Sequence, residues 1–97
     1  MTQLNNVNGE PRFWLGQFNM TDDARLTLNS EDVLTAIRRH HSGDWGDLCP
    51  EDREANETAL QFGGRLFSVY HDRKGVRFWI ITQADRNTTT VFLPADY

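Results

Sequence analysis

Residues 65–93 read RLFSVYHDRKGVRFWIITQADRNTTTVFL and contain three short runs rich in β-branched and aromatic residues. The runs cover residues 65–71, 76–83 and 88–93, and residues of these types favour the pleated, half-buried surface of a strand. The connecting sequences, DRKG and ADRN, are typical of tight turns. We therefore predict an antiparallel meander of three strands, because short turns join neighbouring antiparallel strands.

Two helices are predicted before this meander. Residues 30–43, SEDVLTAIRRHHSG, place Ser30 at the N-cap, acidic residues in the first turn, and Gly43 where a left-handed C-cap belongs. A second helix is expected to begin near Pro50, because proline suits the first helical position, and to end at the glycine pair 63–64.

The aromatic-rich residues 12–21 predict one more strand, with Gly16 as a bulge or a point of close approach. Residues 22–29 are interpreted as a connector. The order β-α-α-β-β-β predicts a small two-layer α+β domain, with two helices packed on an antiparallel sheet of about four strands. Because residues 1–11 are polar and lack periodicity, we expect a flexible leader there and a single domain over residues 12–97.

The charge of the chain is unevenly distributed. The net charge is −4, yet residues 44–57 hold six acidic side chains and one basic one, whereas residues 65–86 hold five basic and two acidic ones. Proteins that bind nucleic acid nonspecifically usually present a net basic surface, so a nucleic-acid partner is not expected. The acidic segment instead suggests a protein partner, and a homodimer is a further option.

No apolar run approaches the roughly 18 residues needed to cross a membrane, and no apolar stretch follows a basic start. A membrane span and a secretory signal are therefore not expected. The lone cysteine, Cys49, cannot form an internal disulfide and suits a reducing compartment. These features favour a cytoplasmic protein.

The candidate site lies in residues 40–48, HHSGDWGDL. In a structural interpretation, Trp45 packs into the core while Asp44 and Asp47 accept hydrogen bonds from nearby backbone N–H groups. In a functional interpretation, the same two carboxylates lie beside His40 and His41 and form a site.

Three chemistries could use this group of residues. Cleavage of RNA would combine His40 or His41 with His71 as acid and base, and Arg86 would neutralise phosphate. A metal site is not expected, because the histidine and aspartate spacing matches no ligand pattern, and no cofactor is predicted. Catalysis by the Cys49 thiolate is disfavoured because the acidic residues that follow it oppose ionisation of the thiol.

The turn TQADRNTT and the tryptophan before it also allow two interpretations. Asp85 either satisfies the backbone of its own turn or, with Arg86, joins an anion site beside the GDWGD residues. Trp79 belongs either to the core or to an exposed binding face.

Long motifs in this chain resemble a family of small bacterial proteins carried on plasmids and other mobile elements, some labelled restriction-system subunits. The shared pattern is close to R-H-x-S/T-G-D-W-G-D, then S-x-Y, W-I-I-T-E-A-D-R-x-x-T-T and L-P-x-x-Y, and covers roughly residues 12–97. This chain has Gln83 where the family usually has glutamate. The resemblance implies an accessory role for a mobile element and assigns no activity.

From these observations we expect a noncatalytic interaction or accessory protein of a mobile genetic element, which inhibits a host defence system through its acidic face. The alternative is a compact ribonuclease or ribosome-dependent toxin that uses His40 or His41 with His71. The binding candidates are Asp44, Trp45, Asp47, Asp85 and Arg86.

Overall fold

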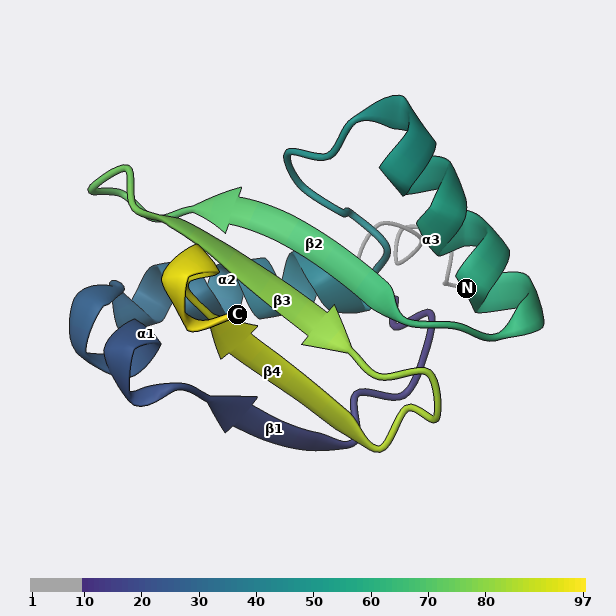
Figure 1. Ribbon diagram of the computed structural model, residues 1–97, viewed down its shortest axis with the longest axis horizontal. Helices are drawn as coiled ribbons and strands as arrows, with labels where there is room; N and C mark the ends of the chain where they lie inside the picture. The colour runs from purple at the N-terminus through teal and green to yellow at the C-terminus, as the bar shows by residue number, and fades with distance from the viewer. Residues whose placement is uncertain (1–9) are drawn as a thin grey trace, which may run out of the picture.

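The three predicted C-terminal strands form the middle and one edge of a four-stranded sheet. In the computed structural model, which describes residues 10–97, these are β2 (Leu66–His71), β3 (Arg77–Thr82) and β4 (Thr88–Phe92). β2 pairs antiparallel with β3, and β3 pairs antiparallel with β4, as the meander predicts. The strand order is β1-β4-β3-β2 (Figure 1), and the α+β class is confirmed.

β1 (Gln17–Met20) departs from the prediction in its direction. It pairs with β4 in parallel, so the sheet is mixed rather than antiparallel. The chain leaves β1, passes through the helical region and returns in β2, so β1 and β4 are brought together by long-range packing. Gly16 is a point of close approach, as expected, because a Cβ there would collide with the backbone of Asn87.

Among the described residues, three α-helices, rather than two, accompany the sheet. α2 (Ser30–His41) and α3 (Pro50–Phe62) are the predicted helices, and a short 3-10 turn, η2 (Pro94–Asp96), follows β4. The predicted connector instead contains α1 (Asp22–Thr27), whose first turn is capped when the Thr21 hydroxyl accepts a hydrogen bond from the backbone N–H of Ala24.

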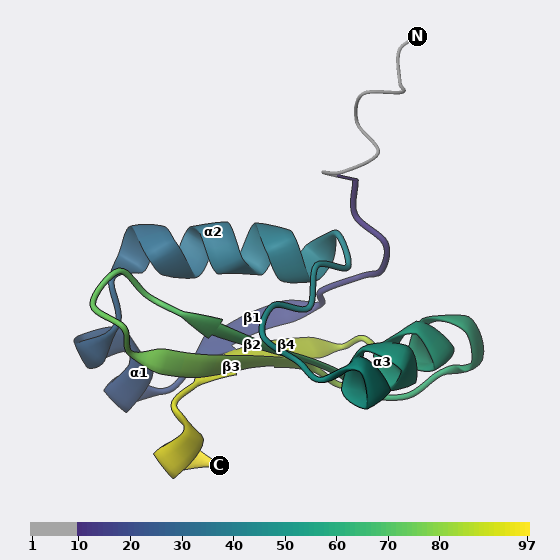
Figure 2. The ribbon, with the colours of Figure 1, turned by 90° about the horizontal axis from the view of Figure 1, so that it is seen from above.

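The layers are arranged differently from the prediction. α2 lies across one face of the sheet, α3 lies beside the sheet near β2, and the C-terminal turn lies on the opposite side from α2 (Figure 2). The N-cap of α2 is Asn29, one residue before the predicted Ser30, because the Asn29 side chain accepts the hydrogen bond from the backbone N–H of Asp32. Of the predicted leader, residues 1–9 lie outside the described part of the chain.

The main core lies between α2 and the sheet. Val33 and Ala36 of α2 pack against side chains from one face of the three C-terminal strands, where Phe78 and Ile80 are fully buried. Burying such side chains stabilises a fold by about 1.5–3 kcal/mol each relative to exposure. A second cluster joins α3 to β2 through Trp45, Leu48, Ala59, Leu66 and Val69.

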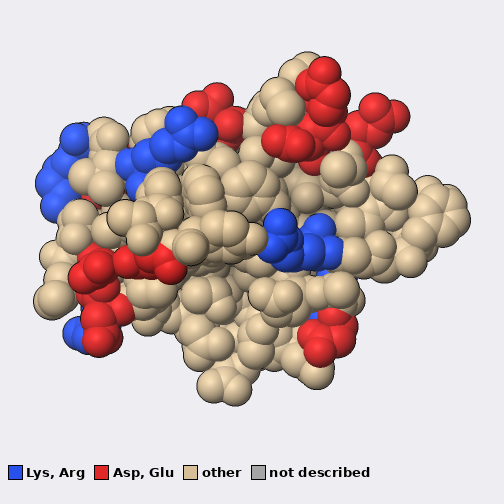
Figure 3. Space-filling model, viewed as in Figure 1, with Lys and Arg blue, Asp and Glu red and all other residues tan. Residues whose placement is uncertain are grey.

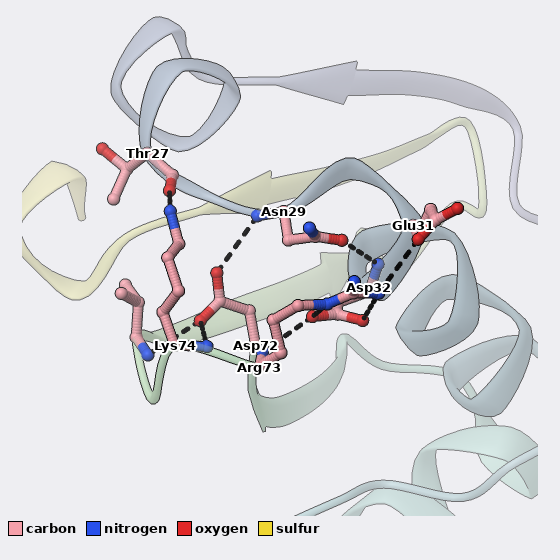
Figure 4. Close-up of polar contacts among 8 residues, drawn as sticks. Thr27, Asn29, Glu31, Asp32, Asp72, Arg73 and Lys74 are labelled. Atoms are coloured by element: carbon pink, nitrogen blue, oxygen red, sulfur yellow. Dashed lines mark hydrogen bonds and ion pairs between the residues drawn. The ribbon is translucent and has the colours of Figure 1, made fainter.

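The β2–β3 turn is tied to the start of α2. The buried carboxylate of Asp72 accepts hydrogen bonds from the backbone N–H groups of Asn29, Lys74 and Val76 (Figure 4). Burial alone would raise the pKa of Asp72, but these three donors hold it below its ordinary value. The neighbouring Arg73 pairs with Asp32, so polar contacts fix both the helix start and the hairpin.

Candidate functional site

The GDWGD residues, 43–47, follow the end of α2 and lie along the outer edge of β2. The backbone N–H of Gly43 donates to the His40 carbonyl and that of Asp44 to the Arg39 carbonyl, which is the Schellman pattern of a helix C-terminus. Gly43 has a φ of 86°, as its predicted capping position requires.

Beyond this cap, the chain pairs with β2. The backbone N–H of Val69 donates to the Trp45 carbonyl, and that of Asp47 donates to the Val69 carbonyl. Gly46 forms a parallel bridge with Val69 and lies so close that a Cβ would collide with the Val69 carbonyl oxygen. The loop therefore covers backbone groups that an edge strand would otherwise expose.

Asn56 extends this covering along the same edge. Its side-chain amide donates to the Phe67 carbonyl at 2.7 Å and accepts from the Phe67 N–H at 3.1 Å. Asn56 thus takes the place of a neighbouring strand at this position. Asn56 is buried on the face of α3 that packs toward β2, and the helical spacing alone does not identify its partner there.

The two candidate residues at the centre of the loop have structural contacts. Asp44 forms an ion pair with Arg39 at 2.8 Å, and this contact, with a hydrogen bond from the Gly46 N–H, lowers the pKa of Asp44. The Trp45 side chain is 2% exposed, and its indole N–H donates to Glu57 at 2.9 Å. The predicted inward packing of Trp45 is confirmed.

His40 is buried beneath this loop rather than open to a ligand. Its Nδ1 contacts the Ser68 hydroxyl at 2.6 Å and its Nε2 contacts the Thr82 hydroxyl at 2.9 Å. The imidazole points toward the sheet, and these two strand hydroxyls occupy both of its nitrogens, so it makes no hydrogen bond to the GDWGD backbone. Burial, and secondarily the charges of His41 and Arg86, lower the pKa of His40 to about 3.

The three histidines lie in different surroundings. His41 donates a hydrogen bond from Nε2 to the Phe13 carbonyl. His71 is exposed at the end of β2, and strand alternation directs it to the opposite face from Ser68, the partner of His40. The structure therefore does not bring His40 and His71 into one cleft.

Asp47 and His71 do share a surface. Both line an open groove at the β2 edge, together with Arg39, Gly46, Val69 and Tyr70. The Tyr70 hydroxyl donates to the Asp44 carbonyl, and burial raises the Tyr70 pKa, so this hydroxyl stays neutral. Its lining holds one exposed carboxylate, that of Asp47, and one imidazole, that of His71, and no further side chain in the lining is placed to act as a base.

Arg86 links the turn between β3 and β4 to the C-terminal end of α3. Its guanidinium donates to the carbonyls of Gly64 at 2.6 Å and Ala59 at 3.1 Å, at the C-terminal end of α3. A positive group is favourable there because the helix dipole is negative at that end. Asp85 accepts a hydrogen bond from the Asn87 N–H within its own turn. Arg86 and Asp85 therefore both have partners within the fold, and an anion could bind Arg86 only by displacing these carbonyl groups.

Other candidate chemistries gain no support from the geometry of residues 10–97. Within that range, no group of three or more His, Cys, Asp and Glu side chains could hold a metal ion. Cys49 is a free, exposed thiol at the N-cap of α3. Among the same residues, no helix is long and apolar enough to cross a membrane.

Trp79 belongs to an aromatic cluster on the sheet face away from α2. Its ring contacts Phe67 at 5.2 Å and Phe92 at 5.8 Å between centroids, and Tyr97 packs on it at 5.3 Å. Tyr97 therefore docks on the body of the domain. Trp79 is partly buried, and its indole N–H has no partner among the described residues.

The acidic side chains of α3 form a distinct surface. Figure 3 shows them gathered over α3, at one side of the molecule. Within the described residues, Glu51, Asp52 and Glu54 are exposed and take part in no ion pair. Arg53, the base among them, donates instead to the Leu48 and Gly46 carbonyls. The negative charge of this face is therefore not neutralised within the described chain.

Comparisons of the chain with protein-family models, with curated proteins and with solved structures find no match. The site and its geometry are therefore the basis for the functional argument.

Proposed function

We propose that this chain is a noncatalytic protein-interaction or accessory protein of a mobile genetic element, and that its acidic face inhibits a host defence system. The observation that carries the proposal is the unpaired acidic face of α3, defined by Glu51, Asp52 and Glu54. α3 lies beside the sheet rather than on it (Figure 2), so its outer face is free to contact a basic surface. The cytoplasm is the compartment that this role requires.

The arrangement of contacts at the GDWGD loop supports a binding role over a catalytic one. Asp44, Trp45 and Arg86 all hold parts of the fold together, and His40 is neutral and buried. A general base needs access to substrate, which buried His40 lacks, and the exposed Asp44 carboxylate is engaged by Arg39. Among the candidate surfaces, the outer face of α3 gathers three exposed acidic side chains that take part in no ion pair among the described residues.

Neutralising the acidic face tests this proposal. Bacterial cells with a defined restriction system would express the chain, and the plating efficiency of unmodified phage would be measured. We expect the chain to raise plating efficiency, and the triple variant Glu51→Gln, Asp52→Asn, Glu54→Gln to lower that effect by about tenfold or more, because the charges that match a basic partner surface are lost.

A matched control neutralises three acidic residues elsewhere, with Asp22→Asn, Asp23→Asn and Glu31→Gln. This variant should protect phage as well as the original chain does, because it changes net charge equally without altering α3. Equal loss of protection in both variants would show that net charge matters rather than the α3 face. Full protection by the α3 variant would contradict the proposal.

The ribonuclease alternative predicts a different result. Incubation of the purified chain with labelled RNA, and separately with ribosomes, should give no cleavage, because His40 and His71 do not face one cleft. Cleavage that is lost in both His40→Gln and His71→Gln, with circular dichroism showing both variants folded, would establish the alternative. Such variants typically lose about 10²–10⁴-fold in rate when the replaced histidine is a general acid or base.

A further inference from the structure

The two edges of the sheet differ in whether their outward-facing backbone groups have hydrogen-bond partners. At the β2 edge, the loop around Trp45 and the amide of Asn56 satisfy the outward-facing backbone groups of Val69 and Phe67. At the other edge, β1 forms the margin of the sheet, and no element of residues 10–97 lies beyond it (Figure 1). A covered edge cannot accept another strand, whereas an open one can.

The direction of the free backbone groups in β1 follows from its bonds to β4. The Gln17 N–H donates to the Asn87 carbonyl and the Thr21 N–H donates to the Val91 carbonyl. Because backbone groups alternate along a strand, those of Gln17, Asn19 and Thr21 face β4, and those of Phe18 and Met20 face outward. Among residues 10–97, no contact to these outward groups is found.

The segment around β1 lacks two of the common devices against edge pairing, although β1 itself is short, with four residues. Residues 13–21 carry no charged side chain and no proline, and both are common devices that block an edge strand. Phe18 on β1 is 44% exposed, Trp14 before it is 76% exposed, and Leu26 on α1 after it is 78% exposed. Apolar side chains thus lie before, within and after the open edge.

We propose that the occupant of this edge is a second copy of the same chain, with the two β1 strands antiparallel about a two-fold axis at Asn19. In this register, Phe18 of each copy faces Met20 of the other, and the outward N–H and C=O groups of both residues are satisfied. The Trp14 end of each copy approaches the α1 end of the other, which holds Leu26. A two-fold contact requires one self-complementary surface, and this segment provides it.

Charge is compatible with this register. Residues 17–21, which pair in this register, carry no charged side chain, and the nearest acidic residues, Asp22 and Asp23, begin α1 outside the paired segment. No like charges are placed directly opposite one another, and such pairs would destabilise a sheet. The acidic face of α3 is at the opposite edge, so the pairing leaves it free.

The mass of the full chain in solution is the first test. Light scattering after gel filtration, over a dilution series from micromolar to millimolar, should give twice the 11.2 kDa of one chain at the upper concentrations. Phe18→Lys should shift the particle to the mass of one chain, because a lysine at an edge opposes pairing. The control Phe62→Lys, an equal change at the exposed end of α3, should remain a dimer.

A crosslink tests the register without relying on Phe18→Lys remaining folded. In a Cys49→Ser background, Asn19→Cys should form an intermolecular disulfide under mild oxidation, because the two residues at the axis lie directly opposite in a non-hydrogen-bonded pair. Gln61→Cys on α3 should not. A single-chain mass for the original protein at every concentration, a dimer that Phe18→Lys leaves intact, or no crosslink at residue 19 would each overturn the proposal.

Discussion

Replacing Trp45 by alanine is expected to lower the free energy of unfolding by about 3–5 kcal/mol, as large-to-small changes of buried aromatic residues do. The ring is 2% exposed, stacks on Phe13 at 6.1 Å and meets the edge of the His40 ring at 5.7 Å between centroids. It also packs in the cluster that joins α3 to β2. Its loss would leave a cavity beneath the loop and remove the donor to Glu57.

Equilibrium unfolding in urea, followed by circular dichroism, measures this loss. Trp45→Phe separates the ring from its hydrogen bond, since phenylalanine retains much of the apolar volume, so a smaller loss is expected. Phe62→Ala removes an aromatic ring that is 76% exposed and should change stability by no more than about 0.5 kcal/mol. An unchanged midpoint for Trp45→Ala would contradict the structural role of the loop.

The predictable part of this fold rests on local signals. Glycine and proline identify the C-terminal end of α2 and the start of α3, and runs of β-branched and aromatic residues identify β2, β3 and β4. α1 also has a local signal, Thr21 followed by two aspartates, but the helix has six residues and lacks a clear apolar period. Its cap could therefore have identified it, although its periodicity could not.

The unpredicted part rests on contacts between residues distant in the chain. The parallel pairing of β1 with β4 depends on how helices and strands pack together, and β1 alone gives no indication of its partner. Ser68, Thr82 and Thr89 resemble ordinary strand residues, yet all three are buried in one hydrogen-bonded chain with His40. No spacing rule identifies such a group, because the sheet register brings it together.

The donor and acceptor of each hydrogen bond between His40 and Thr89 can be assigned by starting from Thr89, the last residue of this hydrogen-bonded chain. The Thr89 hydroxyl donates to the Leu15 carbonyl at 2.7 Å, so Thr89 must accept from the Thr82 hydroxyl. The Thr82 proton is then committed, and Thr82 must accept from Nε2–H of His40. Nδ1 of His40 consequently accepts from Ser68, and the imidazole is neutral with its proton on Nε2.

Neutral His40 links the stability of the fold to pH. The unfolded chain binds a proton at this histidine below its ordinary pKa of 6.5, whereas the folded chain resists protonation until about pH 3 because the charged ring would be buried. Between these values the unfolded state holds more protons, so stability falls as pH falls. The loss is about 1.4 kcal/mol for each pH unit, and it reaches about 3 kcal/mol near pH 4.

Urea unfolding across the range from about pH 6.5 to pH 4 measures this slope. Carboxylates such as Asp44 and Asp72, whose pKa values are lowered, lose their stabilising effect mainly at lower pH, so the slope in this range belongs chiefly to His40. His40→Gln keeps an amide donor and acceptor without a titrating ring, and should flatten the slope even if it unfolds more easily at neutral pH. His71→Gln, at an exposed position, should keep the original slope. If the free energy of unfolding of the original protein were constant down to pH 4, His40 would bind its proton equally well in the folded and unfolded chains. That result would contradict a neutral, buried imidazole hydrogen-bonded to Ser68 and Thr82.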